Sequence, residues 1–117
     1  MNEVSELSAD VEALPVKAVA ELLSVPVTRV HQHVRDGLYL SFRRDGVAHV
    51  PADFFDGTTV VKGLQGTIVV LRDGGFADPE ILRWLFSEDD SLPGTPIASL
   101  REGRHREVKR RAQAMAF

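Results

Sequence analysis

The chain has 117 residues, of which 44% are hydrophobic and 26% charged, so it can form one modest core and we expect a single domain. It contains no cysteine, which excludes disulfides, a thiolate zinc site and a thiol nucleophile. Because it has no apolar run long enough to span a bilayer and no signal-peptide pattern, we expect a cytoplasmic protein without a membrane partner.

The net charge of −3 is unevenly distributed along the chain. Residues 24–49 carry four arginines against two aspartates, and residues 94–117 carry six lysines and arginines against two glutamates. A basic segment of an acidic protein can still form a face that binds nucleic acid. The net charge therefore does not exclude DNA as a partner.

Residues 1–13 are polar and acidic, and we expect a disordered tail there. Ser5 and Ser8 lie among its acids, where a phosphate would add negative charge that competes for a basic DNA-binding face. The simpler alternative is that both serines are inert. Leu14 and Pro15 then begin the first predicted helix.

The stretch over residues 19–37, VAELLSVPVTRVHQHVRDG, predicts two short helices joined by a tight turn. The first helix ends near Leu23, and the second covers residues 26–36. Gly37 is placed to end the second helix in a left-handed conformation. Ser24 occupies the turn position at which many helix-turn-helix motifs carry glycine.

The second helix has a polar outer face whose side-chain types can reach base edges and phosphates. These side chains are Thr28, Arg29, Gln32, Arg35 and Asp36. The helix would be roughly 16 Å long, which suits a major groove about 12 Å wide. The alternative is an ordinary helical hairpin with a solvated polar face.

Residues 38–50 predict a β-hairpin, because Asp45-Gly46 is a strong turn signal. We expect a three-residue loop that pairs Arg43 with Val47, since this register gathers the apolar side chains on one face. Those side chains are Leu40, Phe42, Ala48 and Val50. Arg43 would then face solvent and Arg44 would lie at the tip, where both can reach phosphates or the minor groove. The alternative is a charged edge that blocks association between sheets.

The C-terminal half reads as helical. The expected elements are a helical turn at 51–55, a connection at 56–63, a buried helix at 64–73, a helix at 78–86, an acidic loop at 87–94 and a last helix at 95–116. A phase slip at Gly103 predicts a kink or a break in the last helix. This basic helix can be a solvated helix packed on the body, a source of further phosphate contacts or a dimer contact.

From Leu14 to Phe117 the chain resembles a family of small actinobacterial winged helix-turn-helix DNA-binding proteins related to a mycobacterial serine/threonine-kinase substrate. The segments that carry the resemblance are VAELLSVPVTRVHQHVRDG, VPADFF, VVKGLQGTIVVLRDGGFADPEILRWLF and REVKRRAQAMAF. The first of them also resembles excisionase and MerR-type winged modules. The resemblance implies DNA binding, no enzyme activity and a serine/threonine kinase as a further partner. The DNA-binding residues that it implies are Thr28, Arg29, His31, Gln32, Arg35, Arg43 and Arg44.

No catalytic constellation can be argued from the sequence. His31 and His33 are two residues apart on a predicted helix, so they point in different directions and cannot share a metal ion. We therefore expect neither a catalytic site nor a metal or cofactor.

The predicted fold is mainly α with a small β-hairpin, as a winged helix-turn-helix over residues 14–57 followed by a helical extension over residues 58–117. The expected function is sequence-influenced binding of double-stranded DNA by a transcriptional or nucleoid-associated regulator. The alternative is a protein-interaction module that uses the basic C-terminal helix. The sequence leaves the target DNA open, and also the choice between a monomer and a weak dimer.

Overall fold

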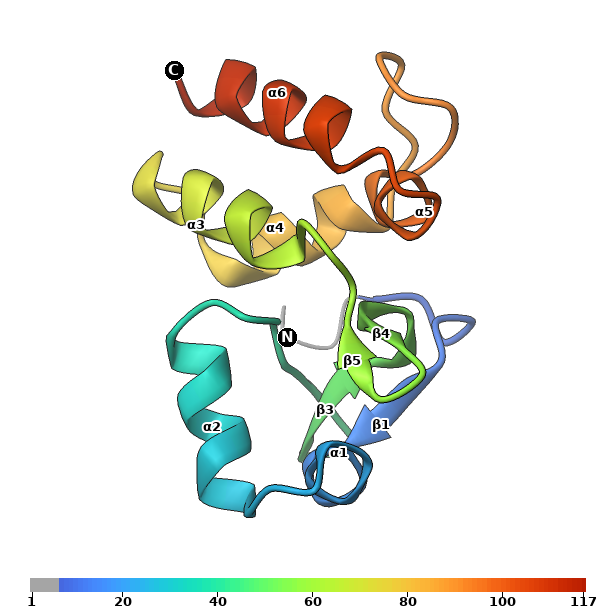
Figure 1. Ribbon diagram of the computed structural model, residues 1–117, viewed down its shortest axis with the longest axis vertical. Helices are drawn as coiled ribbons and strands as arrows, with labels where there is room; N and C mark the ends of the chain where they lie inside the picture. The colour runs from blue at the N-terminus through green and yellow to red at the C-terminus, as the bar shows by residue number, and fades with distance from the viewer. Residues whose placement is uncertain (1–6) are drawn as a thin grey trace.

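The computed structural model describes residues 7–117 and confirms a mainly helical fold with a winged helix-turn-helix and a helical C-terminal part (Figure 1). The helices are α1 (Val16–Leu23), α2 (Val27–Arg35), α3 (Leu64–Asp73), α4 (Asp78–Leu85), α5 (Pro96–Arg101) and α6 (His105–Ala116). The strands are β1 (Ala13–Pro15), β2 (Phe42–Arg44), β3 (Val47–Pro51), β4 (Phe55–Asp56) and β5 (Thr59–Val60), with a 3-10 turn at Ala52–Phe54. No helix of residues 7–117 is long and apolar enough to cross a membrane.

Helices α1 and α2 form the predicted helix-turn-helix. Ser24 lies between them in the left-handed conformation, with φ 58° and ψ 45°. Glycine adopts this conformation without steric cost, which explains why many motifs of this kind carry glycine at the turn. Gly37 follows α2 with φ 80°, as the sequence predicts. Val19 and Val30 are fully buried and join the two helices to the core.

The N-terminal segment differs from the prediction. Ala13, Leu14 and Pro15 form β1, which pairs antiparallel with β3 and makes the sheet order β1-β3-β2. The Glu12 carbonyl also accepts a hydrogen bond of 2.9 Å from the Ala52 N–H. Ala13, which the sequence placed in the tail, therefore belongs to the sheet, and Leu14 and Pro15 precede the first helix, which begins at Val16. Leu7 and Ala13 also pack against the hydrophobic cluster. Ser5 lies outside the described residues.

The predicted register of the β2–β3 hairpin was wrong. Phe42 lies opposite His49 and Arg44 opposite Val47, so the loop is the two-residue turn Asp45-Gly46. Both turn residues have positive φ, 56° and 79°, as a type I′ turn requires. In this register His49 shares a face with Phe42 and is half-buried.

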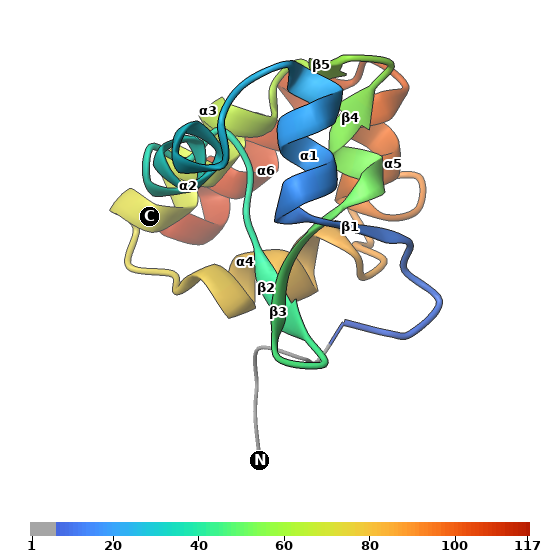
Figure 2. The same cartoon turned by 90° about the horizontal axis from the view of Figure 1, so that it is seen from below.

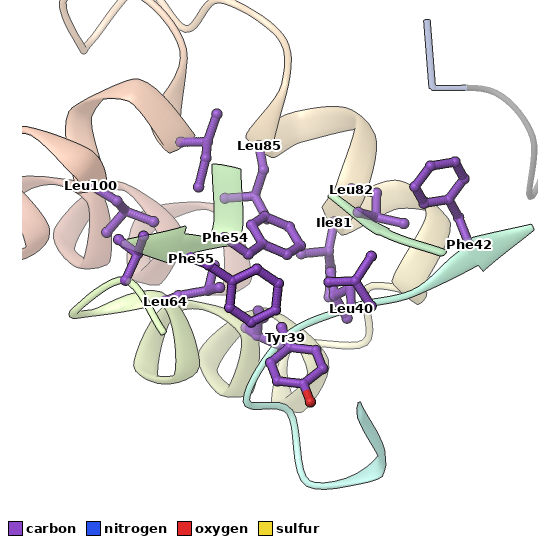
Figure 3. Packing of buried hydrophobic residues seen from close by; sticks show 14 of the residues in the cluster. Tyr39, Leu40, Phe42, Phe54, Phe55, Leu64, Ile81, Leu82, Leu85 and Leu100 are labelled. Carbon is purple, nitrogen blue, oxygen red and sulfur yellow. The ribbon is translucent and has the colours of Figure 1, made fainter. Parts of the chain in front are cut away.

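The register differs because the hairpin is covered on both faces. Phe42 and Val50 lie on opposite faces of the sheet, yet Phe42 is only 4% exposed and Val50 is fully buried. In Figure 3 the side chains of Phe42 and Leu82 point toward one another. A choice of register that assumes one buried face therefore fails, since helix α4 provides the second cover.

The C-terminal half follows the predicted helices closely. Helix α3 spans the predicted residues 64–73, and the last helix breaks at Gly103, where φ is +88°, into α5 and α6. The predicted connection at 56–63 contains an additional small hairpin formed by β4 and β5. Figure 1 shows α3 between α2 on one side and α6 on the other.

Both halves of the chain contribute to one hydrophobic cluster (Figure 3). The Tyr39 and Phe55 rings meet edge to face with centroids 5.4 Å apart, and the Phe54 and Phe86 rings lie 5.7 Å apart. Leu64 and Ile81 of the helical half are fully buried in the same cluster. The helix-turn-helix is therefore supported from behind by the C-terminal helices.

Candidate nucleic-acid interface

Helix α2 exposes all the DNA-binding residues that the resemblance implies for it. These are Thr28, Arg29, His31, Gln32 and Arg35. Val30 on the opposite side is fully buried and Val34 is half-buried, so the apolar stripe holds the helix and the polar face is left to solvent. In Figure 2 the helix is seen nearly end-on at the edge of the molecule.

The beginning of α2 is open to an anionic ligand. Its cap residue is Pro26, which has no side-chain acceptor for the first N–H groups of the helix. Free N–H groups and the positive end of the helix dipole favour a phosphate at such a position. Val27 beside it is 41% exposed, an unusual exposure for an apolar residue on the core-facing stripe.

The two arginines of the hairpin have different environments, because neighbouring residues of a strand point to opposite faces. Arg43 is exposed, and its Nη1 donates a hydrogen bond of 2.7 Å to the Gly46 carbonyl. Figure 2 shows the turn of this hairpin extending beyond the helices, and Arg43 next to the turn is exposed.

Arg44 does not lie at the tip of the loop, as the three-residue loop required, but in strand β2. It is half-buried, with Nη1 donating to the Val11 carbonyl at 3.0 Å and Nη2 to the Ser8 carbonyl at 3.2 Å. Its guanidinium also lies 5.1 Å from the centre of the Phe42 ring. These contacts tie the N-terminal segment to the hairpin and occupy the arginine.

The C-terminal end of α2 is held by Arg72 of α3. The Nη1 and Nη2 atoms of Arg72 donate to the carbonyls of Arg35 and Val34, at 2.9 and 3.0 Å. Asp78 in turn accepts two hydrogen bonds of 3.0 Å from the same guanidinium and fixes its plane. This clamp satisfies helix carbonyls that would otherwise lack a partner and sets the direction in which α2 leaves the body.

A second contact anchors α2 from within. The His33 Nδ1 atom and the Tyr39 hydroxyl form a hydrogen bond of 2.9 Å, and the two rings meet edge to face. Burial raises the pKa of Tyr39 to about 12, so its hydroxyl stays neutral and keeps this bond. His33 is therefore a support of the helix, and its neighbours His31 and Gln32 are the exposed polar residues.

Sequence reasoning missed Arg72, Asp78 and Tyr39 as supports of the interface. Asp78 is the first residue of α4, whose cap position is Ala77, and it pairs with Arg72. Arg72 is 37 residues from Arg35, and no local pattern relates them. Within residues 7–117 no group of three or more His, Cys, Asp or Glu side chains could hold a metal ion.

Comparison with known proteins gives consistent matches over both halves of the chain. Residues 3–55 match a family described as "DNA-binding protein Rv2175c, wHTH domain", and residues 61–116 match "Rv2175c C-terminal domain of unknown function". The chain is 42% identical over 124 residues to DNA-binding protein Rv2175c of Mycobacterium tuberculosis. The alignment covers 95% of this chain and 85% of that protein. The NMR structure of Rv2175c is similar with a TM-score of 0.87 at 41% identity, covering 96% of this chain and 86% of that one.

Proposed function

Because the chain belongs to the winged helix-turn-helix family of DNA-binding protein Rv2175c, we propose that it binds double-stranded DNA with α2 in the major groove and the β2–β3 hairpin on the adjacent backbone. The membership confirms the resemblance drawn from the sequence. One observation carries the proposal. Arg29 and Arg35 project from the polar face of α2, and neither guanidinium has a hydrogen-bond or ion-pair partner among residues 7–117.

The roles follow from the position of each side chain on α2. Thr28, Arg29 and Gln32 lie in the first half or middle of the helix, where side chains of a recognition helix reach base edges. His31 adds a further donor or acceptor on the same exposed face. Arg35 lies in the last turn and contacts a phosphate.

In the wing, which is the β2–β3 hairpin, the main phosphate contact is Arg43, which is exposed. Arg44 contacts DNA only by exchanging its hydrogen bonds to Ser8 and Val11. Its larger role in this proposal is to hold the N-terminal segment against the hairpin.

The biological setting that we propose is a cytoplasmic or nucleoid-associated regulator with some preference for sequence. A serine/threonine kinase is a further proposed partner. Ser8 is exposed and its carbonyl accepts from Arg44, so a phosphate on Ser8 would add negative charge beside the wing. Both parts go beyond DNA binding itself and depend on it.

Fluorescence anisotropy of the full chain with labelled duplexes tests the proposal. Random-sequence DNA and DNA from upstream of the protein's own gene are titrated at two salt concentrations. We expect binding that weakens as salt is added. The Arg29→Ala/Arg43→Ala variant should have at least tenfold lower affinity than the wild-type protein. Lys62→Ala, which removes an exposed cation outside α2 and the wing, serves as the control and should change affinity less than twofold.

Preference for the upstream DNA supports a regulatory role, and equal affinity for both duplexes contradicts it. Absence of binding by folded protein at low salt overturns the DNA-binding proposal. If Arg29 reads a guanine, Arg29→Ala also reduces discrimination among sequences by about 1–3 kcal/mol.

A further inference from the structure

Helix α6 carries three cations that nothing in the described structure neutralises. The other basic residues of this region are engaged: Arg101 donates to the carbonyls of Asp53 and Phe55, Arg104 pairs with Glu102 and Glu107, and Arg111 pairs with Asp89. Arg106, Lys109 and Arg110 are exposed and have no hydrogen-bond or ion-pair partner among residues 7–117. The helix therefore presents an uncompensated charge of +3 to solvent.

These three side chains form one face, which we call the outer face of α6. Val108 and Ala112 are fully buried on the side that packs against α3. At 100° per residue, Arg106 and Arg110 lie on the opposite side with exposed Gln113 beside them. Lys109 lies at the edge of this face, and its exposed side chain extends toward Gly66 of α3. Of the exposed large apolar side chains of residues 7–117, none lies within α6 itself, and Phe117, which follows the helix directly, is 92% exposed.

The arrangement is unfavourable for the helix by itself. Arg106 and Arg110 are like charges at a spacing of four residues, which destabilises a helix. Arg106 lies in the first turn, at the positive end of the helix dipole, and the last turn has no basic residue. A bound polyanion would remove both penalties.

The outer face of α6 points away from α2. Arg72 of α3 contacts the end of α2, and α6 packs on α3 along its length, so α3 separates the two (Figure 1). The described chain measures 35 × 33 × 26 Å, and α2 and α6 lie on opposite sides of this body. A straight duplex on α2 therefore does not reach the outer face of α6.

We propose that the outer face of α6 is a second binding site for the DNA phosphate backbone, through which one molecule bridges two duplex segments. This inference rests on the proposed function, because α2 provides the first contact. Phosphate recognition needs cations and polar donors without an apolar anchor, which matches Arg106, Lys109, Arg110 and Gln113. A protein partner would favour aromatic or apolar anchors across the face, whereas the exposed aromatic ring near it, Phe117, lies only at its end.

Bridging also has a physical advantage over independent binding. Once α2 holds one segment, a neighbouring segment of the same DNA is present at high effective concentration. Three phosphate contacts are weak for free DNA at physiological salt, but they suffice for a tethered segment. The C-terminal half thus acquires a DNA-directed role in addition to supporting α2.

A capture assay with the full chain tests the inference. One duplex is immobilised on beads, and capture of a second, fluorescent duplex of the same sequence is measured at increasing protein concentration. We expect wild-type protein to capture the second duplex. Capture should be at least fivefold lower for the triple variant Arg106→Gln/Lys109→Gln/Arg110→Gln. Anisotropy with a single duplex should differ less than twofold between the two proteins.

Two matched variants control for charge and folding. Arg106→Lys/Arg110→Lys keeps the charge and should retain most of the capture. Lys62→Gln removes an exposed charge elsewhere and should retain all of it. Thermal unfolding checks that the triple variant is folded. Glutamine is used because it is a good helix former and should preserve α6.

Several results would overturn the inference. Wild-type protein that binds one duplex without capturing a second leaves DNA binding intact and removes the second site, whereas protein that binds no duplex removes both proposals. Equal capture by the triple variant assigns bridging to another surface. If sedimentation shows a wild-type dimer and a monomeric triple variant, or if polyglutamate is bound in place of DNA, α6 is a protein-binding helix.

Discussion

At the scale of the residue, Asp89 shows how one carboxylate orders a polar loop. Its oxygens accept hydrogen bonds from the Trp84 indole N–H at 3.0 Å, the Arg111 Nε at 3.1 Å and the Ser91 hydroxyl at 2.7 Å. Its side chain is only 7% exposed, although it lies in the acidic loop that the sequence SEDDSLPG predicts. Asp89 thus connects the loop to both α4 and α6.

The environment of Asp89 predicts that the folded protein loses stability in acid. The Ser91 hydroxyl first, and then Trp84, the Ser91 N–H and Arg111, hold the pKa of Asp89 well below its usual range. Because the folded-state pKa is lowered, the ionised carboxylate stabilises the protein above the unfolded pKa of about 3.9, and this contribution is lost as pH falls further. Denaturation between pH 7 and pH 2 measures it.

Asp89→Asn tests this assignment. At pH 7 the variant should be less stable by about 1–3 kcal/mol, since it loses charge-assisted hydrogen bonds, and its stability should fall less steeply below pH 4. Asp90→Asn, an exposed neighbour, is the control. An unchanged acid profile in Asp89→Asn would assign the loss to other carboxylates.

At the scale of the element, the position of α2 depends on α3. The Arg72 guanidinium reaches two carbonyls of α2 and both oxygens of Asp78 at once, which a lysine ammonium cannot do. We therefore expect Arg72→Lys to lower the free energy of unfolding by about 1–2 kcal/mol and to weaken DNA binding several-fold in folded protein. Anisotropy and denaturant unfolding separate the two effects.

Arg104→Lys is the matched control for Arg72→Lys. Arg104 forms ion pairs with Glu102 and Glu107, but all three side chains are largely exposed. Exposed pairs contribute little to stability, so this substitution should change neither property measurably. Normal DNA affinity in Arg72→Lys would show that α2 is positioned by its apolar stripe alone.

Helices α3 and α6 pack closely at a glycine. A Cβ atom on Gly74 would lie 2.5 Å from the Ala116 Cβ and 2.9 Å from its Cα, a distance that requires the end of α6 to move. Gly74→Ala should therefore destabilise the fold by about 1–3 kcal/mol. Gly66 lies in the interior of α3 with no atom closer than 3.8 Å to such a Cβ, so Gly66→Ala should stabilise by about 0.5–1 kcal/mol.

The pair of glycine variants is read by thermal or denaturant unfolding. The chemical change is the same in both, and only the proximity of α6 differs. Equal effects in the two variants would mean that α6 does not approach Gly74 as closely in solution.

At the scale of the whole molecule, an acidic protein must bind DNA through a local set of cations. Arg29, Arg35 and Arg43 are the exposed arginines of α2 and the wing, whereas Arg44 is half-buried and engaged with Val11. If Arg35 and Arg43 each neutralise one phosphate and Arg29 adds one charge in the groove, log K falls against log salt concentration with a slope of about −3. A fourth contact from Arg44 would give a slope of about −4.

Arg35→Ala should reduce this slope by about one unit and weaken binding to all sequences alike, because a phosphate contact carries no base information. Anisotropy at four or more salt concentrations measures it. A change in sequence preference in Arg35→Ala would instead place this side chain on a base.

Much of the architecture could be predicted because its signals are local. Helix α3 has the predicted bounds because Gly63 and Gly74 bracket an apolar segment, and α6 begins after the predicted break at Gly103. The exposed face of α2 follows from the helical period, since Val30 and Val34 determine which side is buried. Family membership could be recognised because the distinctive segments extend through the C-terminal half.

The features that were missed depend on residues distant in the chain. The Arg44 guanidinium binds a carbonyl 33 residues away, and Arg72 binds carbonyls 37 and 38 residues away. The strand β1 forms because β3 has a free edge that backbone groups can pair with, whatever the side chains in residues 13–15. No periodicity in the sequence reports such contacts.

The sequence by itself determined the local elements, the family and the set of side chains that α2 exposes, because helical period, turn residues and caps act over a few residues. Only the tertiary structure decided the register of the wing, the engagement of Arg44 and the clamp on α2. The physical reason is that the burial of a side chain depends on residues from distant parts of the chain that pack against it. Phe42 is buried because α4 covers its face of the hairpin, and that cover comes from the other half of the chain.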